Sequence, residues 1–491
     1  MRICIVIQSD AFRESAGMRI RYDRFRDCLT DPEVTIEAIT CAVLIATPKL
    51  DHDVYIFCKT FDVGALVLAR RIHAAGKVVG QDLFDDYFSQ YADSRLERFR
   101  EWMRDMAPVT RFALCSTPRM VEAVRPYLPG IRIEPVDDPV IGYDPLMVAA
   151  LAEAKVRRAH ESRLIEIAWF GIGDNPYFPV GIADLIACEA DLARIERQGW
   201  TVRLRIVTNT RPFDGIGAEV LRGLSVAHEF VEWTEQAERE VLTRATVALV
   251  PVNGQSFSRA KSMNRAVTAL NGGCQVLNIG YPLYDRLDAF LYRDVDTLLA
   301  DMTAGHCRVR SETMTALTQE LWAMANPFES AARFVRQARL ALSAPPPPVQ
   351  GPLCLVHGQN SVMAYHKATM ALRGISVATM FTRAGWNFNM RFDVVAGEVR
   401  VRLATALASR FMPPLLPGDP IRIGDLDFLE LDLAALGVPA FPVPAVQDPG
   451  CHARMVDYVD RCCRAAFGPI DLLASDTLPA RQALRTVRAA A

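Results

Sequence analysis

The fold is indicated at the start of the chain, where Arg2-Ile-Cys-Ile-Val-Ile7 is a short β-branched run followed by a longer helical pattern, Met18–Leu29. Runs of the same kind return through the first 150 residues at Val34–Ala38, Val54–Phe57, Val78–Leu83, Phe112–Ser116 and Ile131–Val136. Helical stretches separate them, including Val63–Ala75 and Ser94–Ala107. Strands that alternate with helices indicate a parallel sheet covered on both faces.

The pattern then begins again in the middle of the chain. Strands are expected at Ile165–Phe170, Val202–Thr208, His228–Val231, Val247–Val250 and Gln275–Asn278. Helices are expected near Ile182–Gln198, Gln236–Arg244 and Lys261–Leu270, and the charged stretch Lys155–Arg163 is the expected helical connector. We therefore predict two doubly wound α/β domains in tandem.

A run of four prolines, Pro345–Pro348, marks the sharpest domain boundary, because such a run forms a stiff extended linker. The predicted domains are residues 1–150, 151–343 and 352–491. The helical region Ser311–Leu342 before the prolines should pack back across the first two domains.

The third domain is expected to be an additional α/β unit without an assigned role. It begins with strand Leu353–His357, helix Ser361–Arg373 and strand Ile375–Phe381, and continues with a hairpin of Phe392–Ala396 and Glu398–Leu403. The spacing of His357, His366 and His452 matches no recognised metal site. Segment Arg383–Arg391 mixes aromatic and amide side chains, which suits either carbohydrate binding or a packed loop.

Composition excludes several classes of protein. The 491 residues carry 55 Lys and Arg against 57 Asp and Glu, a net charge of −2, so no basic excess can drive nucleic-acid binding by counterion release. Hydrophobic residues form 51% of the chain and charged residues 23%, as in ordinary globular proteins. The twelve cysteines form no Cys-x-x-Cys pair, and no apolar segment is long enough for a membrane span or a signal peptide. We expect a soluble cytoplasmic protein with reduced cysteines.

Tandem Rossmann-like domains bind ligands in a cleft between the carboxyl ends of their sheets. The turn after the first strand, from Gln8 to Arg19, lacks Gly-x-Gly-x-x-Gly and therefore disfavours a dinucleotide. Gly17, Arg19 and Arg21 occupy the loop after the first strand and are candidates to approach a phosphate across the cleft, or else form a helix start with surface arginines.

The most informative chemical motif is Phe257-Ser-Arg-Ala-Lys-Ser-Met-Asn-Arg265. It predicts a helix start with Ser262 and Asn264 beside the cations Lys261 and Arg265. Free backbone N–H groups and the positive end of a helix dipole suit a diphosphate there, and the two cations would add charge-assisted bonds. The alternative is a serine-capped helix with solvated basic residues.

This motif resembles the nucleotide-diphosphate site of GT-B glycosyltransferases, especially bacterial members of the retaining group related to glycosyltransferase family 4. Those proteins carry a Lys-Ser-x-Asn-Arg start, a helix of small residues and then Gly-x-Pro-Val, similar to 261–276 of this chain. Residues 55–87 and 231–251 are also similar to that group, so the resemblance spans about residues 1–340. It implies a GT-B fold, with an acceptor-binding first domain and a donor-binding second domain.

The chain departs from the commoner family pattern at two positions. That pattern has a Glu-x₇-Glu pair whose members would fall at Ala260 and Thr268, and its glutamates contact the donor sugar and ribose. The resemblance places Thr268 beside the donor. Family members with Lys-Ser-x-Asn-Arg also lack the pair, so the resemblance still favours an enzyme.

Other residues of the expected cleft follow strands. Asp82, Asp85 and Asp86 lie at or just beyond the end of the strand Val78–Leu83, where a carboxylate could accept the proton of an acceptor hydroxyl or hold the acceptor. A helix cap and a solvated turn are the alternative for these residues. Gly171 and Gly173 form a turn that lets the backbone approach a phosphate, although it also suits an ordinary tight turn. Trp233 is a candidate to flank the base, or else a core aromatic.

The stretch Ser94–Met106 allows two interpretations. Its Leu96, Phe99, Met103 and Met106 recur at helical spacing among arginines, a pattern that lipid-directed glycosyltransferases use at membranes. Acidic residues neutralise most of that charge, so we favour a helix that faces the domain core.

The sequence thus predicts a glycosyltransferase of polysaccharide biosynthesis that moves a sugar from a nucleoside-diphosphate sugar to a glycan or lipid-linked acceptor, with retention, no metal and no other cofactor. Peripheral contact with the inner membrane face and no nucleic-acid partner are part of this hypothesis. The alternative is a catalytically degenerate GT-B scaffold that binds a nucleotide or glycan, with the third domain as an interaction module.

Overall fold

The computed structural model describes residues 1–344 except residues 48, 62, 92, 94, 95, 176 and 210–221; farther along it describes strands and a few single residues. The first sheet is entirely parallel and has the order β2-β1-β3-β4-β5-β6. Its strands are β1 Arg2–Ile7, β2 Thr35–Thr40, β3 Val54–Cys58, β4 Val78–Leu83, β5 Phe112–Cys115 and β6 Arg132–Pro135.

Strand β1 shows why both faces of this sheet are covered. Successive side chains of a strand point to opposite faces. Ile3, Ile5 and Ile7 join one buried cluster, which includes residues of α1 (Arg24–Asp27) and α15 (Pro327–Ser343), whereas Cys4 and Val6 join another. The second cluster includes residues of α3 Val63–Ala74, α4 Glu97–Met106 and α5 Pro118–Val124. A strand buried on both faces is continuously apolar, which is the pattern from which the parallel sheet was predicted.

The second sheet is also parallel and has the order β12-β11-β10-β7-β8-β9. Its strands are β7 Leu164–Phe170, β8 Thr201–Thr208, β9 Ala227–Glu232, β10 Val247–Leu249, β11 Gln275–Leu277 and β12 Leu291–Tyr292. The prediction of two Rossmann-like sheets is confirmed, and the short edge strand β12 is the addition that the sequence did not indicate.

Helices connect the strands of the second unit and cover its two faces. Those that bear on the site are α6 Pro145–Ser162, α7 Ala183–Ala187, α8 Glu189–Arg197, α10 Glu235–Arg244, α11 Ser256–Arg259, α12 Asn264–Asn271 and α13 Val295–Ala304. The connector predicted over 155–163 is the second half of α6, which begins at Pro145 with Asp144 as its N-cap. Helix α12 begins at Asn264, so the prediction that it starts at Lys261 was wrong: Lys261 and Ser262 lie in the loop after α11.

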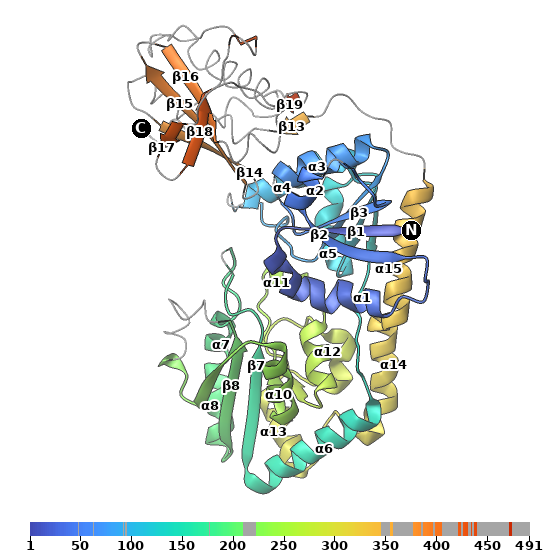
Figure 1. The fold of residues 1–491 in the computed structure, drawn as a ribbon. Helices are drawn as coiled ribbons and strands as arrows, with labels where there is room; N and C mark the ends of the chain where they lie inside the picture. Colours follow the sequence, from blue (N-terminus) through green and yellow to red (C-terminus); the bar gives the residue numbers. More distant parts are fainter. Residues whose placement is uncertain are drawn as a thin grey trace.

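Two consecutive helices join the units. Helix α14 (Met314–Ala325) contributes Leu317 and Leu321 to a core of the second unit. After Asn326, α15 contributes Phe334 and Ala338 to the core behind the first sheet. Figure 1 shows the pair running along both units. The expectation that this region packs back across both domains is confirmed.

Helix α4 settles the two interpretations of its sequence. Leu96, Phe99, Met103 and Met106 are at most 4% exposed and belong to a core cluster of the first unit. The core-facing interpretation is therefore confirmed, and the apolar face of α4 is not available to a membrane. None of the described helices is long and apolar enough to cross one.

Beyond the prolines, the described strands form a parallel pair and an antiparallel sheet of order β14-β15-β16-β18-β17. They are β13 Cys354–Val356, β14 Val377–Arg383, β15 Trp386–Val395, β16 Glu398–Ala404, β17 Ile421–Ile423, β18 Leu426–Glu430 and β19 Asp471–Leu473. The predicted hairpin is confirmed by the pairing of Val395 with Glu398. The predicted helix 361–373 and His357, His366 and His452 lie outside the described residues.

Candidate functional site

The strand orders place one candidate ligand position on each sheet. In a doubly wound sheet, ligands bind at the carboxyl ends of the strands where the strand order reverses. The reversal lies between β1 and β3 in the first sheet and between β7 and β10 in the second. Lys59 directly follows β3 and Gly171 directly follows β7, so these residues mark the two positions.

Asp85 links the two units. It follows β4, and its carboxylate is 7% exposed. The Lys59 ammonium lies 2.5 Å from Oδ2, and the Lys261 ammonium of the second unit donates to Oδ1. Burial raises the pKa of this carboxyl, but Lys261 and Lys59 lower it more, so the net pKa lies below its ordinary value. The predicted acceptor residue and the predicted donor residue are therefore bound to each other.

Each of these lysines also lies over an aromatic ring. The Lys59 Nζ is 4.4 Å from the centre of the Phe84 ring, and the Lys261 Nζ is 4.1 Å from that of Phe257. Lys59 has a φ of 51°, a left-handed conformation that is uncommon for a residue other than glycine. Strained backbone of this kind concentrates at functional sites.

Arg265 lies at the switch point of the second sheet. Its guanidinium carbon is 5.3 Å from the centre of the Trp169 ring and 5.7 Å from that of Phe170. Its Nε and Nη2 are buried and have no hydrogen-bond partner among the described residues. Buried donors need hydrogen-bond acceptors, and a bound anion at this position would supply them.

Gly171 lies against the side chain of Arg265. Its φ is +145°, and a Cβ at this residue would lie 3.5 Å from Arg265 Nε. The next glycine of the turn, Gly173, donates its N–H to Asn209 Oδ1 at 3.1 Å. The turn therefore lies beside Arg265, and its approach to a phosphate stays a prediction.

The other polar residues of the 261–265 motif contact one another and the first unit. Asn264 Nδ2 donates to Ser262 Oγ at 2.9 Å and to the Asp138 carboxylate. Asp138 follows β6 and also accepts from Arg21 Nη1 at 2.9 Å. The motif therefore lies against the carboxyl edge of the first sheet.

Asp82 is far less accessible than the sequence suggested. It is fully buried; Arg21 Nε and Nη2 donate to its two oxygens at 2.7 and 3.0 Å, and the Tyr22 hydroxyl donates at 2.5 Å. Arg21, expected as a surface or phosphate-binding residue, is 1% exposed and also donates to Val136 O at 2.6 Å. This network ties the helix after β1 to strands β4 and β6.

Asp86 and Gly17 also have local contacts. Asp86 is 2% exposed, and its Oδ1 accepts the N–H groups of Phe88 at 3.0 Å and Ser89 at 2.9 Å. This is the turn-capping alternative for Asp86. A Cβ at Gly17 would lie 2.8 Å from the Phe84 ring, so only glycine lets the loop after β1 pass that ring.

Trp233 lies at a second contact between the units. Its Nε1 donates to Glu238 Oε2 at 2.8 Å, and the Arg19 guanidinium lies 4.5 Å from the centre of its ring. Arg19 is also 3.6 Å from Glu235. Burial raises the pKa of Glu238, a cleft-side carboxylate that sequence reasoning did not select.

The positions of the absent glutamates differ in accessibility. Ala260 is fully buried, and its carbonyl accepts the Thr117 hydroxyl at 2.9 Å. Ala260 belongs to the core cluster of the first unit, as do its neighbours Phe257 and Phe178. Side chains of the first unit therefore fill the space around Ala260. Thr268 is half-buried within α12.

Besides Glu238, the sequence analysis missed the site residues Lys59 and Asp138. The available signal for both was position, since each directly or closely follows a predicted strand of a parallel sheet. Lys59 is in addition one of only six lysines in the chain.

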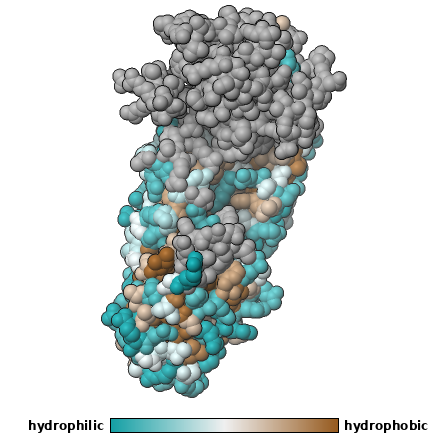
Figure 2. Space-filling view, turned by 90° about the vertical axis from the view of Figure 1, so that its left-hand side faces the viewer, coloured by the Kyte–Doolittle hydropathy of each residue, from teal (hydrophilic) through white to brown (hydrophobic). Residues whose placement is uncertain are grey.

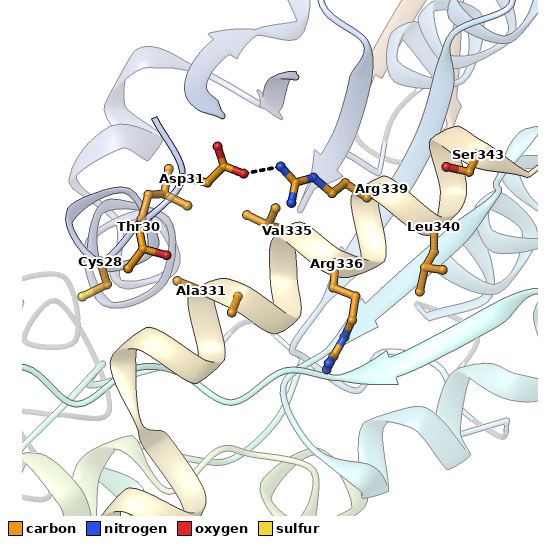
Figure 3. Close-up of a pocket in the computed structure, with 11 residues that line it drawn as sticks. Cys28, Thr30, Asp31, Ala331, Val335, Arg336, Arg339, Leu340 and Ser343 are labelled. Carbon is orange, nitrogen blue, oxygen red and sulfur yellow. Dashed lines mark hydrogen bonds and ion pairs between the residues drawn. The ribbon is translucent and has the colours of Figure 1, made fainter. Parts of the chain in front are cut away.

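One described cavity has Arg19 and Tyr22 in its lining, so it adjoins the second contact between the units, whereas another lies away from this interface. A cavity of about 450 Å³ lies between α15 and the segment after α1, with Asp31 bonded to Arg339 across it (Figure 3). Asp31 precedes β2, so the cavity lies toward the amino ends of the strands, opposite the candidate site. Among the described residues, no group of three or more His, Cys, Asp and Glu side chains is arranged to hold a metal ion.

One face of the surface bears on the expectation of membrane contact. On the described surface visible in Figure 2, hydrophobic residues occur in small groups among hydrophilic ones. This face therefore shows no broad apolar surface below the grey region.

Comparison with known proteins identifies the fold. No protein-family model matches the chain, and no curated protein sequence matches it. Two solved structures that match are an alpha,alpha-trehalose-phosphate synthase (UDP-forming) from Burkholderia xenovorans in complex with glucose-6-phosphate and the trehalose-6-phosphate synthase OtsA. Both have a TM-score of 0.50, with 12% and 9% identity, and cover 69% of this chain and 100% and 99% of their own. The chain has the GT-B fold.

The GT-B architecture accounts for the arrangement of the site. Its two parallel sheets meet through their carboxyl edges, where Asp85 pairs with Lys261 and Asp138 with Asn264. The helix pair α14–α15 returns the chain to the first unit. Residues 261–265 of the GT-B second unit therefore lie between the two switch points.

Proposed function

We propose that this GT-B protein is a glycosyltransferase that moves a sugar from a nucleoside-diphosphate sugar to a hydroxyl of a glycan or lipid-linked acceptor. The observation that carries the proposal is Arg265, whose buried Nε and Nη2 lack partners at the switch point of the second sheet. A diphosphate would supply the missing acceptors and the matching charge. The structural neighbour from Burkholderia xenovorans is UDP-forming, which supports UDP as the first diphosphate to test.

In this proposal the cations stabilise the leaving diphosphate. Negative charge develops on it as the bond to the sugar breaks, and Lys261, Arg265 and the start of α12 are placed to stabilise that charge. We propose retention of configuration and no requirement for a metal ion, because these groups offer the charge that a divalent ion provides elsewhere. Asp85 is the carboxylate that would orient the acceptor hydroxyl.

The finer assignment rests on the sequence motif. We propose membership of the bacterial group related to glycosyltransferase family 4, and a cytoplasmic role in polysaccharide biosynthesis. Trp233, Arg19, Gly173 and Thr268 are proposed to line the donor position, where Trp233 would flank the base.

The proposal is tested by binding and turnover. UDP, GDP, ADP and dTDP are titrated calorimetrically into the full chain, and the matching nucleotide sugars are assayed for released diphosphate. Loss of a charge-assisted bond from Arg265 should weaken diphosphate binding by roughly 10- to 100-fold in Arg265→Met. Arg239→Met removes an exposed arginine that pairs only weakly with Glu235, at 3.6 Å, and serves as the matched control. If none of the four diphosphates binds the wild-type chain, the proposal is wrong.

The alternative function is nucleotide binding without transfer. The burial of Ala260 favours this alternative. The commoner family pattern has a glutamate at this position, and here a glutamate side chain would displace the first unit. Tight diphosphate binding without turnover of any nucleotide sugar, in the presence of an extract that supplies glycan and lipid-linked acceptors, would select this alternative.

A further inference from the structure

The Asp85 carboxylate binds two lysine ammonium groups, although one would balance its charge. Lys59 comes from the first unit and Lys261 from the second, and both bind the same side chain. Asp85 is 7% exposed, whereas the Lys261 side chain is 40% exposed. The lysine that we propose binds the donor is therefore neutralised by a carboxylate of the opposite unit.

We propose that Asp85 occupies, in the donor-free protein, the place on Lys261 that a donor phosphate takes, so that donor entry displaces it. The inference rests on the proposed function. It adds that this internal anion competes with the donor and that Lys59 makes the exchange feasible.

The role of Lys59 follows from burial. A buried carboxylate that loses its cation is strongly destabilised. Because Lys59 remains 2.5 Å from Asp85, the carboxylate stays paired when Lys261 leaves. The left-handed backbone of Lys59, with φ 51°, holds this cation at the end of β3 where it can do so.

Lys261 also contacts an aromatic ring, and this contact can remain when its anionic partner changes. Its ammonium lies 4.1 Å from the centre of the Phe257 ring, a contact that tolerates a change of anionic partner because it is not directional in the way of a hydrogen bond. Arg265, four residues further on, already has unpartnered donors. The exchange thus moves one cation of the second unit from a carboxylate of the first unit to the diphosphate.

The exchange also links the two substrates. Once Lys261 binds the donor, Asp85 Oδ1 is free to accept a hydrogen bond from an acceptor hydroxyl. Donor binding would therefore precede productive acceptor binding.

The test compares UDP affinity by calorimetry in four variants of the full chain. Asp85→Asn removes the competing charge and should bind UDP roughly three- to tenfold more tightly than wild type, as expected for a partly exposed ion pair. Lys261→Met should bind UDP more weakly. In the Lys261→Met background, Asp85→Asn should change UDP affinity less than twofold, because the competition requires both partners.

Asp86→Asn is the matched control. It removes a neighbouring charge while its amide oxygen can still accept from Phe88 and Ser89 N–H. UDP affinity in this variant should stay within twofold of wild type. If Asp85→Asn and Asp86→Asn increase UDP affinity equally, the increase comes from the lower negative charge of the region and the inference is overturned.

The outcomes separate the inference from the proposed function. If wild type binds UDP but Asp85→Asn binds it equally or more weakly, the inference is overturned and the proposed function stands. If wild type binds none of the four diphosphates, the proposed function fails first. If Asp85→Asn does not fold, Lys59→Met provides the test. In this variant Lys261 is the remaining lysine bound to Asp85, so UDP binding should weaken several-fold. Unchanged or tighter UDP binding would contradict the inference.

Discussion

Substitution of Asp82 distinguishes a structural role from the catalytic one that its sequence position suggested. The Asp82 carboxylate is fully buried, and both oxygens accept from Arg21. Asp82→Asn keeps the shape of the side chain and removes its charge. We expect the variant to lose stability and to retain nucleotide binding at temperatures where it is folded.

The size of the effect follows from what remains bound to Arg21. Removing one partner of a buried ion pair costs about 3–5 kcal/mol. The lower end applies because Arg21 Nη1 keeps Asp138 at 2.9 Å and Val136 O at 2.6 Å. A loss of about 3 kcal/mol in a unit of this size lowers its midpoint of thermal unfolding by roughly 6–12 °C.

The assay is differential scanning calorimetry of the full chain. The transition of the first unit should shift, while that of the second should not. Asp86→Asn is the control, since its amide oxygen retains the bonds from Phe88 and Ser89, and it should shift that transition by less than about 3 °C.

One result would refute the structural interpretation of Asp82. If Asp82→Asn melts like wild type and binds UDP normally, but no longer transfers sugar, the carboxylate acts on the acceptor. The buried network would then have to open during the reaction to expose Asp82.

Three further predictions concern single features of the second unit and of the bridge. Gly171→Ala places a side chain at a φ of +145° and a methyl against Arg265, so calorimetry should show a loss of about 1–3 kcal/mol in stability and weaker UDP binding. Lys155→Met removes the ammonium that donates to Leu242 O and Gly272 O at 2.6 Å, where α10 and α12 end, and should destabilise the second unit by about 2–5 kcal/mol in thermal unfolding. The pKa of Asp85 is lowered in the folded protein from 3.8, so its contribution to stability is present above about pH 4 and is lost as the pH falls below that value. The difference in melting temperature between wild type and Asp85→Asn should be constant above about pH 5 and begin to shrink as the pH falls below about 4, and a difference that is as large at pH 3 as at pH 5 would contradict the assigned charge.

Regular secondary structure was largely predictable, because strands of a sheet that is buried on both faces are mainly apolar and are separated by amphipathic helices. Strands β1 and β4 have the predicted bounds, and both are buried, although β4 includes the polar residues Gln81 and Asp82. The start of α12 was misplaced by three residues. Lys261 and Ser262 suit a first helical turn, but α11 ends at Arg259 and the chain needs a loop before the next helix.

Contacts between distant segments were not predictable from local pattern. Asp82 and Asp85 occupy similar sequence positions, at or just beyond the end of one strand, yet one is sealed in a network with Arg21 and the other meets Lys261. The difference arises from the helix after β1, which covers Asp82, and from the second unit, which reaches only Asp85. Neither packing partner is visible in the sequence around β4.

Sequence position nevertheless restricts which residues can form the site, and the structure then shows which of their charged groups already have partners. Lys261, Arg265 and Asp85 were each placed at a carboxyl edge by their position after a strand or before a helix. In the folded chain Lys261 is neutralised by Asp85, whereas Arg265 Nε and Nη2 have no partner among the described residues. A diphosphate entering this interface therefore meets one cation that is free and one that must be exchanged. Removing Arg265 should weaken binding, and removing the Asp85 charge should strengthen it, so the two substitutions give effects of opposite sign that a generally destabilised interface could not produce.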